Sequence, residues 1–321
     1  MVDEVIVPKR RPRKTIGEEG SRWQTLTVFL LLLAAGLMLY LPGRVKLTNQ
    51  PINWPQWGKS DEVFTIKKSQ SRVTRPPAAK PNLETIIADK TGDFGVYARS
   101  VIGSEELKLG GNIVMTAASV IKLPVLVVYY QAVDQGRLDP EDEYILAEAD
   151  RWKYGTGRMQ YQPAGTQYTY RQVAQLVANQ SDNMAAEVLI KKLGGYPAAQ
   201  KEIDKLNLEA TSLKDNEISV EDAGWLFFAL AQGKLLTPAS REELFNNLTG
   251  TVNENRIPAG VPDGVRVVHK FGSEAGVVND CGIVTASNPY VICILTTNVN
   301  VGEVEPLLPQ ISAAVWEWLG D

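Results

Sequence analysis

Ser119 and Lys122 are the residue pair best suited to covalent chemistry, and they stand three positions apart at the start of a predicted helix. This spacing places both side chains on one face of a helix, one turn apart. The free amides and the positive dipole end of a helix N-terminus favour negative charge and can lower the pKa of a nearby lysine. Such a lysine can take the proton of a serine hydroxyl and create a nucleophile. By itself, the pair also fits a surface helix with an ordinary lysine.

A second polar cluster, Ser181, Asp182 and Asn183, lies between two predicted helices. In a cleft, the serine can relay a proton and the asparagine can donate to the amide of an acyl group. The same residue types are also preferred helix caps. Taken alone, the cluster fits either a cleft or the start of a helix.

A third element, from His269 to Ser273, reads as a strand at the edge of a sheet. Lys270 presents positive charge to a substrate carboxylate, and Gly272 lets a substrate backbone approach the strand. The alternative is a solvent-facing lysine on an ordinary strand. We interpret His269 as a strand residue at the edge of the cleft, and not as the base of a catalytic triad.

The elements that must position these residues predict an α+β fold, in which an antiparallel sheet carries packed helices. A capping box from Thr169 to Gln172 opens one helix. Ser219 caps another helix, and Thr237 with Pro238 begins the next. The predicted strands are 94–101, 106–111, 265–272, 279–286 and 290–298, and the predicted helices are 119–135, 170–179, 183–193, 220–233, 238 onward and 309–319.

The two cysteines, Cys281 and Cys293, fall at roughly opposed positions on the last predicted hairpin. We interpret both as small buried hydrophobic residues. A cross-strand disulfide is the alternative if the sulfur geometry permits it.

An N-terminal apolar stretch, 26–41, with its neighbours just reaches the length needed to cross about 30 Å of hydrocarbon. Trp23 and Tyr40 stand near its ends, and the basic residues before it keep the N-terminus in the cytoplasm. A cleaved signal peptide and a buried core helix are the alternatives. We therefore expect a single-pass plasma-membrane protein that contacts the lipid bilayer and carries an extracellular catalytic domain. The predicted organisation is a cytoplasmic basic tail (1–22), a transmembrane anchor (23–42), a proline-containing linker (43–81) and a catalytic domain (82–321).

Composition excludes two classes of function. The chain has 321 residues and a formal net charge of -4, which argues against a nucleic-acid partner. It contains 1 histidine and 2 cysteines, too few for a Cys/His metal site with three or four ligands. We expect no cofactor.

In their order along the chain, the three polar elements resemble the serine penicillin-recognising enzymes, most closely the class A β-lactamase-like family, whose motifs are S-x-x-K, S-D-N and K-T-G. The resemblance extends from about residue 83 to residue 319. It implies a β-lactamase/transpeptidase-like α+β fold with an all-helical subdomain.

The resemblance also implies roles for individual residues. Ser119 is the expected acylated nucleophile, Lys122 is its general base or proton relay, and Ser181 shuttles a proton to the leaving nitrogen. The backbone amides of Ser119 and Ser273 are expected to form an oxyanion hole. The implied substrate-binding residues are Asn183 for the side-chain amide, Lys270 for the carboxylate, Gly272 and Ser273.

Two departures from the family pattern bear on the reaction. Phe271 replaces the hydroxyl residue of K-[TS]-G, so the expected substrate specificity is altered. The loop that carries the deacylating glutamate in class A enzymes is shorter here, and Asp215 and Glu217 are the nearest acids. We therefore expect acylation at Ser119 to survive and fast deacylation of a β-lactam adduct to be lost.

Three hypotheses remain open from the sequence. The first is a membrane-anchored serine hydrolase acting on β-lactams. The second is a D-alanyl-D-alanine carboxypeptidase or transpeptidase acting on a peptidoglycan stem peptide. The third is a non-catalytic penicillin sensor or wall-binding module.

Overall fold

The computed structural model describes residues 78–151 and 155–320. The predicted cytoplasmic tail, the predicted membrane anchor and most of the predicted linker lie outside the described residues. Within the two described ranges, no helix combines the length and the apolar character needed to cross a bilayer.

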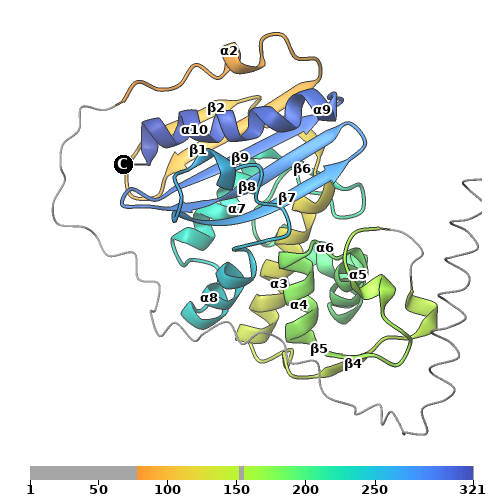
Figure 1. Ribbon diagram of the computed structural model, residues 1–321. Helices are drawn as coiled ribbons and strands as arrows, with labels where there is room; N and C mark the ends of the chain where they lie inside the picture. The colour runs from red at the N-terminus through yellow and green to blue at the C-terminus, as the bar shows by residue number, and fades with distance from the viewer. Residues whose placement is uncertain (1–77, 152–154, 321) are drawn as a thin grey trace, which may run out of the picture. The chain divides into compact units, whose positions relative to one another are not determined.

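A five-stranded antiparallel sheet forms the centre of the fold (Figure 1), and its strands follow the spatial order β2-β1-β9-β8-β7. All five strands were predicted from the sequence, and β7 lies at the edge as expected. The strands are β1 (Asp93–Ser100), β2 (Glu106–Leu109), β7 (Arg266–Glu274), β8 (Val277–Thr285) and β9 (Tyr290–Thr297).

Helices cover both faces of this sheet, so its central strands are buried on either side (Figure 1). In β9, Ile292 and Ile294 pack into the core that includes α10 (Leu308–Leu319). The alternate residues Cys293 and Leu295 pack into the core that includes α7 (Val220–Ala231). This alternation follows from the two-residue period of a strand.

The remaining larger helices group on the α7 side of the sheet, away from α10 (Figure 1). The Thr169 capping box and the Ser219 and Thr237 caps form as predicted. The helix α6 was not predicted; it follows Gly195 and has a proline in its first turn. These helices are α3 (Lys122–Asp134), α4 (Tyr170–Asn179), α5 (Asn183–Lys192), α6 (Tyr196–Asp204) and α8 (Pro238–Asn247).

Several short elements were not predicted from the sequence, because three or four residues carry too little periodicity. Two small antiparallel sheets pair β3 with β6 and β4 with β5. These elements are α2 (Glu84–Ile87), β3 (Val114–Thr116), β4 (Glu143–Ile145), β5 (Gln167–Thr169), β6 (Glu217–Ser219) and α9 (Val301–Val304).

Cys281 and Cys293 lie directly opposite each other on β8 and β9. Both are buried and both are free thiols. The interpretation of the pair as small buried hydrophobic residues is therefore confirmed.

Candidate active site

Ser119 lies in a short 3-10 helix, Ala118–Ile121, that leads into α3. The predicted helical stretch from about Ser119 is therefore confirmed, with its first turn in the 3-10 form and the α-helix α3 beginning at Lys122. A 3-10 helix has three residues per turn, so side chains three positions apart are eclipsed. The Lys122 Nζ atom accordingly lies 3.0 Å from Ser119 Oγ. Ala118 adopts a φ of 45°, in the left-handed region that non-glycine residues seldom occupy.

The Lys122 side chain is buried, with 7% of its surface exposed. Its amino group donates to Ser119 Oγ, to the Ser181 carbonyl and, at 2.6 Å, to Asn183 Oδ1. Burial lowers the pKa of Lys122 to about 7, although the charge of Asp182 acts in the opposite direction. A substantial fraction of this amine is therefore neutral near pH 7 and can accept a proton.

The Ser181 to Asn183 segment begins helix α5 and also contacts two lysines. Asp182 is the N-cap of α5 and accepts from the Ala185 amide at 3.0 Å and from the Met159 amide at 2.8 Å. Ser181 has a φ of 55°. Its hydroxyl accepts from Lys122 at 3.3 Å and from Lys270 at 2.8 Å. Asp182 thus fixes the helix start, and the flanking Ser181 and Asn183 face the lysines.

Lys270 on β7 is fully buried, which rules out the alternative of a solvent-facing lysine. Its amino group donates to Ser181 Oγ and, at 3.0 Å, to the Phe271 carbonyl. The Phe271 ring centroid lies 4.4 Å from the same nitrogen. Burial, together with the nearby charge of Lys122, holds the pKa of Lys270 well below its usual range. The Ser181 hydroxyl therefore bridges two lysines.

Gly272 brings strand β7 against the nucleophile segment. A Cβ atom at this position would lie 2.9 Å from the Ser119 amide nitrogen and 3.0 Å from the Ala117 carbonyl oxygen. The sequence predicted that this glycine makes room for a substrate backbone. In the structure it makes room for the protein's own backbone at Ser119, because any side chain would separate the two segments.

Two buried polar residues that the sequence analysis missed hold the same strands in place. Asn279 on β8 donates to the Ala117 carbonyl at 3.1 Å and accepts from the Thr296 amide at 2.7 Å. Arg256 donates to the Ser273 hydroxyl at 2.6 Å and to the Gly272 carbonyl at 2.9 Å. Neither belongs to a short motif, so only the folded chain brings them to the site.

His269 does not lie at the edge of the cleft, and that part of its interpretation is wrong. The side chain is fully buried, and because alternate residues of β7 point to opposite faces of the sheet it lies on the face away from Lys270. Its Nδ1 lies 2.8 Å from Asp280 Oδ1 and its Nε2 lies 3.1 Å from Glu254 Oε1. Burial lowers its pKa, but the two carboxylates outweigh this and raise it to about 9. Both ring nitrogens are occupied, which agrees with a residue that is not a triad base.

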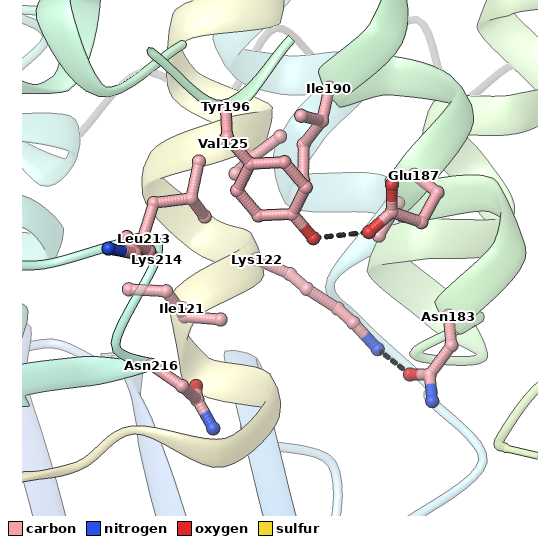
Figure 2. A pocket seen from close by; sticks show the side chains of 11 residues that line it. Ile121, Lys122, Val125, Asn183, Glu187, Ile190, Tyr196, Leu213, Lys214 and Asn216 are labelled. Carbon is pink, nitrogen blue, oxygen red and sulfur yellow. Dashed lines mark hydrogen bonds between the residues drawn. The ribbon is translucent and has the colours of Figure 1, made fainter.

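A cavity of about 450 Å³ lies behind Lys122 and Asn183 (Figure 2). Glu187 on α5 also lines it, four residues after Asn183 and therefore on the same helical face. Neither Asp215 nor Glu217 is among the lining residues. Asp215 accepts from the Ser212 hydroxyl at 2.7 Å, and Glu217 is an exposed residue of β6. Glu187 was not predicted from the sequence, although its spacing from Asn183 was a usable signal.

A serine hydroxyl lies in hydrogen-bond contact with a buried lysine of lowered pKa, and this arrangement is chemically suited to a serine–lysine nucleophile. The chain belongs to the beta-lactamase enzyme family, whose sequence profile matches residues 78–319. Membership of this family implies serine hydrolase activity.

Similar proteins include beta-lactamase VEB-1 of Pseudomonas aeruginosa, which is 23% identical over 265 residues, covering 74% of this chain and 88% of that protein. Among solved structures, PBP-A is 30% identical with a TM-score of 0.69, covering 73% of this chain and 93% of that chain. A beta-lactamase from Sphaerobacter thermophilus is 26% identical with a TM-score of 0.69, covering 73% and 94% of the two chains.

Proposed function

We propose that this protein is a serine acyl-hydrolase that is acylated at Ser119 by β-lactams and hydrolyses them. The observation that carries the proposal is the 3.0 Å contact between Ser119 Oγ and Lys122 Nζ. Because burial lowers the pKa of Lys122 to about 7, its neutral amine can take the hydroxyl proton without a histidine.

The acylation step uses the groups already in contact. Lys122 takes the proton from Ser119 Oγ, and Oγ attacks the lactam carbonyl carbon. The carbon–nitrogen bond then breaks, and Ser181 delivers a proton to the leaving nitrogen from the Lys122 ammonium, 3.3 Å away. The backbone amides of Ser119 and Ser273 stabilise the developing oxyanion, and such donors typically contribute about 3 kcal/mol each. Lys270 and Asn183 bind the substrate carboxylate and the side-chain amide.

One of the similar structures supports a β-lactam as the acylating substrate. A single-substitution variant of PBP-A is described as an acyl-enzyme complex with penicillin G. It is 30% identical to this chain and has a TM-score of 0.68, covering 73% of this chain and 92% of that chain. Penicillin G is therefore the first compound to test.

A peptidoglycan D-alanyl-D-alanine carboxypeptidase or transpeptidase is the second candidate. The observation that favours it is the position of Asp215 and Glu217, neither of which lines the cavity behind Lys122. The same Ser119 acylation applies to a peptide substrate, with an amine as the leaving group. A non-catalytic penicillin sensor is less well supported, since the buried lysines and Ser181 remain in contact.

The test is incubation with penicillin G, followed by the intact mass of the protein over time. We expect an adduct with the mass of the whole penicillin, followed by its loss and the release of penicilloate. Ser119→Ala is expected to abolish the adduct. An adduct that never decays, together with release of D-alanine from a stem peptide, would favour the second candidate. The proposal would be contradicted if neither penicillin G nor a fluorophosphonate formed an adduct with the protein.

We also infer that residues 23–42 anchor the enzyme in the plasma membrane, with the catalytic domain outside. This inference rests on the apolar stretch 26–41 and the basic residues before it. The full chain is expected to remain with membranes after alkaline carbonate extraction and to enter the soluble fraction when residues 1–42 are removed. A full chain that carbonate releases would contradict the anchor.

A further inference from the structure

We infer that Glu187 is the general base that activates water to release the acyl group from Ser119. This inference rests on the proposed acylation of Ser119 and extends it to the second half of the reaction. It assigns a role to a carboxylate on α5, in place of Asp215 and Glu217, the acids that the sequence had suggested.

The cavity behind Lys122 provides room for the water. Its volume is about 450 Å³, whereas one water molecule in the liquid takes about 30 Å³. Apolar side chains form much of its wall, and they include Ile121, Val125, Ile190 and Leu213. The polar lining includes Asn183 and Glu187, whose side chains can donate a hydrogen bond to a water and accept one from it.

Glu187 is the one carboxylate among the residues that line this cavity. Figure 2 shows its carboxylate on the same side of the cavity as the Lys122 amino group, with Asn183 beside the lysine. Lys122 is itself 3.0 Å from Ser119 Oγ. A water between Glu187 and Lys122 would therefore be separated from the acylated Ser119 Oγ only by the Lys122 amino group.

The orientation of this carboxylate is fixed by a neighbouring helix. The Tyr196 hydroxyl, from the first residue of α6, donates to Glu187 Oε1. Burial, followed by this hydrogen bond to Glu187, raises the pKa of Tyr196, so the phenol stays protonated and remains a donor. A general base needs such an orienting partner. Tyr196 is thus a positioning residue for Glu187.

Atoms and protons balance in the proposed hydrolysis of the acyl group. Glu187 takes a proton from water while the water oxygen attacks the acyl carbon bonded to Ser119 Oγ. The tetrahedral intermediate then collapses and the bond between that carbon and Oγ breaks. The proton held by Glu187 returns through the Lys122 amine to Oγ. The products are the free serine hydroxyl and a carboxylic acid, and one water is consumed.

The experiment compares adduct formation and adduct loss by intact mass in the full chain and three variants, with penicillin G as the acylating agent. Glu187→Gln is expected to form the adduct within about twofold of the normal rate and to lose it at least about tenfold more slowly. Tyr196→Phe is expected to slow the loss by a few-fold. The exposed Glu217→Gln is the matched control, and it should leave both rates unchanged.

Two further readouts separate catalysis from a structural effect. The rate of adduct loss is also measured across a pH series, and the form of this profile is expected to differ between the unchanged protein and Glu187→Gln because the general base has been removed. In Glu187→Ala, added formate should restore part of the rate of adduct loss, because formate is a small carboxylate that can take the place of the missing side chain.

Equal rates of adduct loss in Glu187→Gln and the unchanged protein would overturn the role of Glu187 and leave the proposed function intact. An adduct on the unchanged protein that persists without loss would also overturn the role of Glu187. Failure of the unchanged protein to form any adduct would instead overturn the proposed function itself.

Discussion

The two sides of Lys122 differ in packing. On the side of Ser119, which is itself half-buried, Ser181 and Lys270 are buried and joined by a hydrogen bond. Gly272 leaves no space there for even a Cβ atom. On the other side lies a cavity of about 450 Å³. The difference indicates that the groups for acylation are held rigidly in place, whereas the space for a second reactant remains open.

Removal of the Lys122 amine should have the largest effect on the packed side. Lys122→Met keeps the length of the side chain and is expected to reduce the rate of acylation by penicillin G about 10²- to 10⁴-fold, because the general base is lost. Stopped-flow or intact-mass kinetics measure this rate. Lys191→Met is a control, since that lysine pairs with Asp150 at the surface. Equal acylation rates in Lys122→Met and the control would show that the contact with Ser119 has no chemical role.

The pH dependence of acylation should show the same base. Because burial lowers the pKa of Lys122 to about 7, the neutral amine is depleted below that pH and predominates above it. The rate is therefore expected to rise with pH to a plateau above about 7, and to fall about 100-fold two pH units below it. The initial acylation rate across this range, with folding checked by circular dichroism, provides the test. A rate that falls as pH rises through 7 would contradict a neutral lysine base.

Gly272→Ala should disturb the packed side by displacing one backbone from another. The added Cβ would stand 2.9 Å from the Ser119 amide nitrogen, so the nucleophile must shift. We expect acylation to slow by about tenfold, since small misplacements of reacting groups are costly. Gly302→Ala is the matched control, because its Cβ would meet nothing closer than 3.7 Å. If Gly272→Ala acylates as fast as Gly302→Ala, the close packing of β7 against Ser119 is not needed for acylation.

A substitution in the cavity wall should have the smallest effect. Ile190→Val removes one methylene from the far side of the cavity and is expected to change acylation by less than about twofold. It should lower the free energy of unfolding by about 1 kcal/mol, a usual value for this change in a buried position. Urea denaturation measures the second quantity. A loss of acylation as large as that of Gly272→Ala would remove the distinction between the two sides.

The sheet was largely predictable because its five strands carry clear apolar runs, and the capped helices were predictable because Thr169, Ser219 and Thr237 are strong N-terminal signals. The 3-10 form of the turn at Ser119 was not predictable. Gly272 of β7 packs against this turn, and that long-range contact is visible only in the folded chain.

The motif residues of the site were visible in the sequence, whereas their supports were not. Ser119, Lys122 and Lys270 belong to recognisable patterns. Arg256 and Asn279 act through backbone carbonyls that only the folded sheet presents to them. His269 and Lys270 point to opposite faces of β7, and both are buried because both faces of the strand are covered, which a single strand pattern does not reveal.

The most direct measurement of the central claim is the position of the acyl group on the chain. The protein is quenched in acid soon after mixing with penicillin G, digested, and sequenced by tandem mass spectrometry. We predict that the penicilloyl mass lies on the hydroxyl of Ser119. The same mass on Ser181 or on another residue, with Ser119 unmodified, would contradict the account.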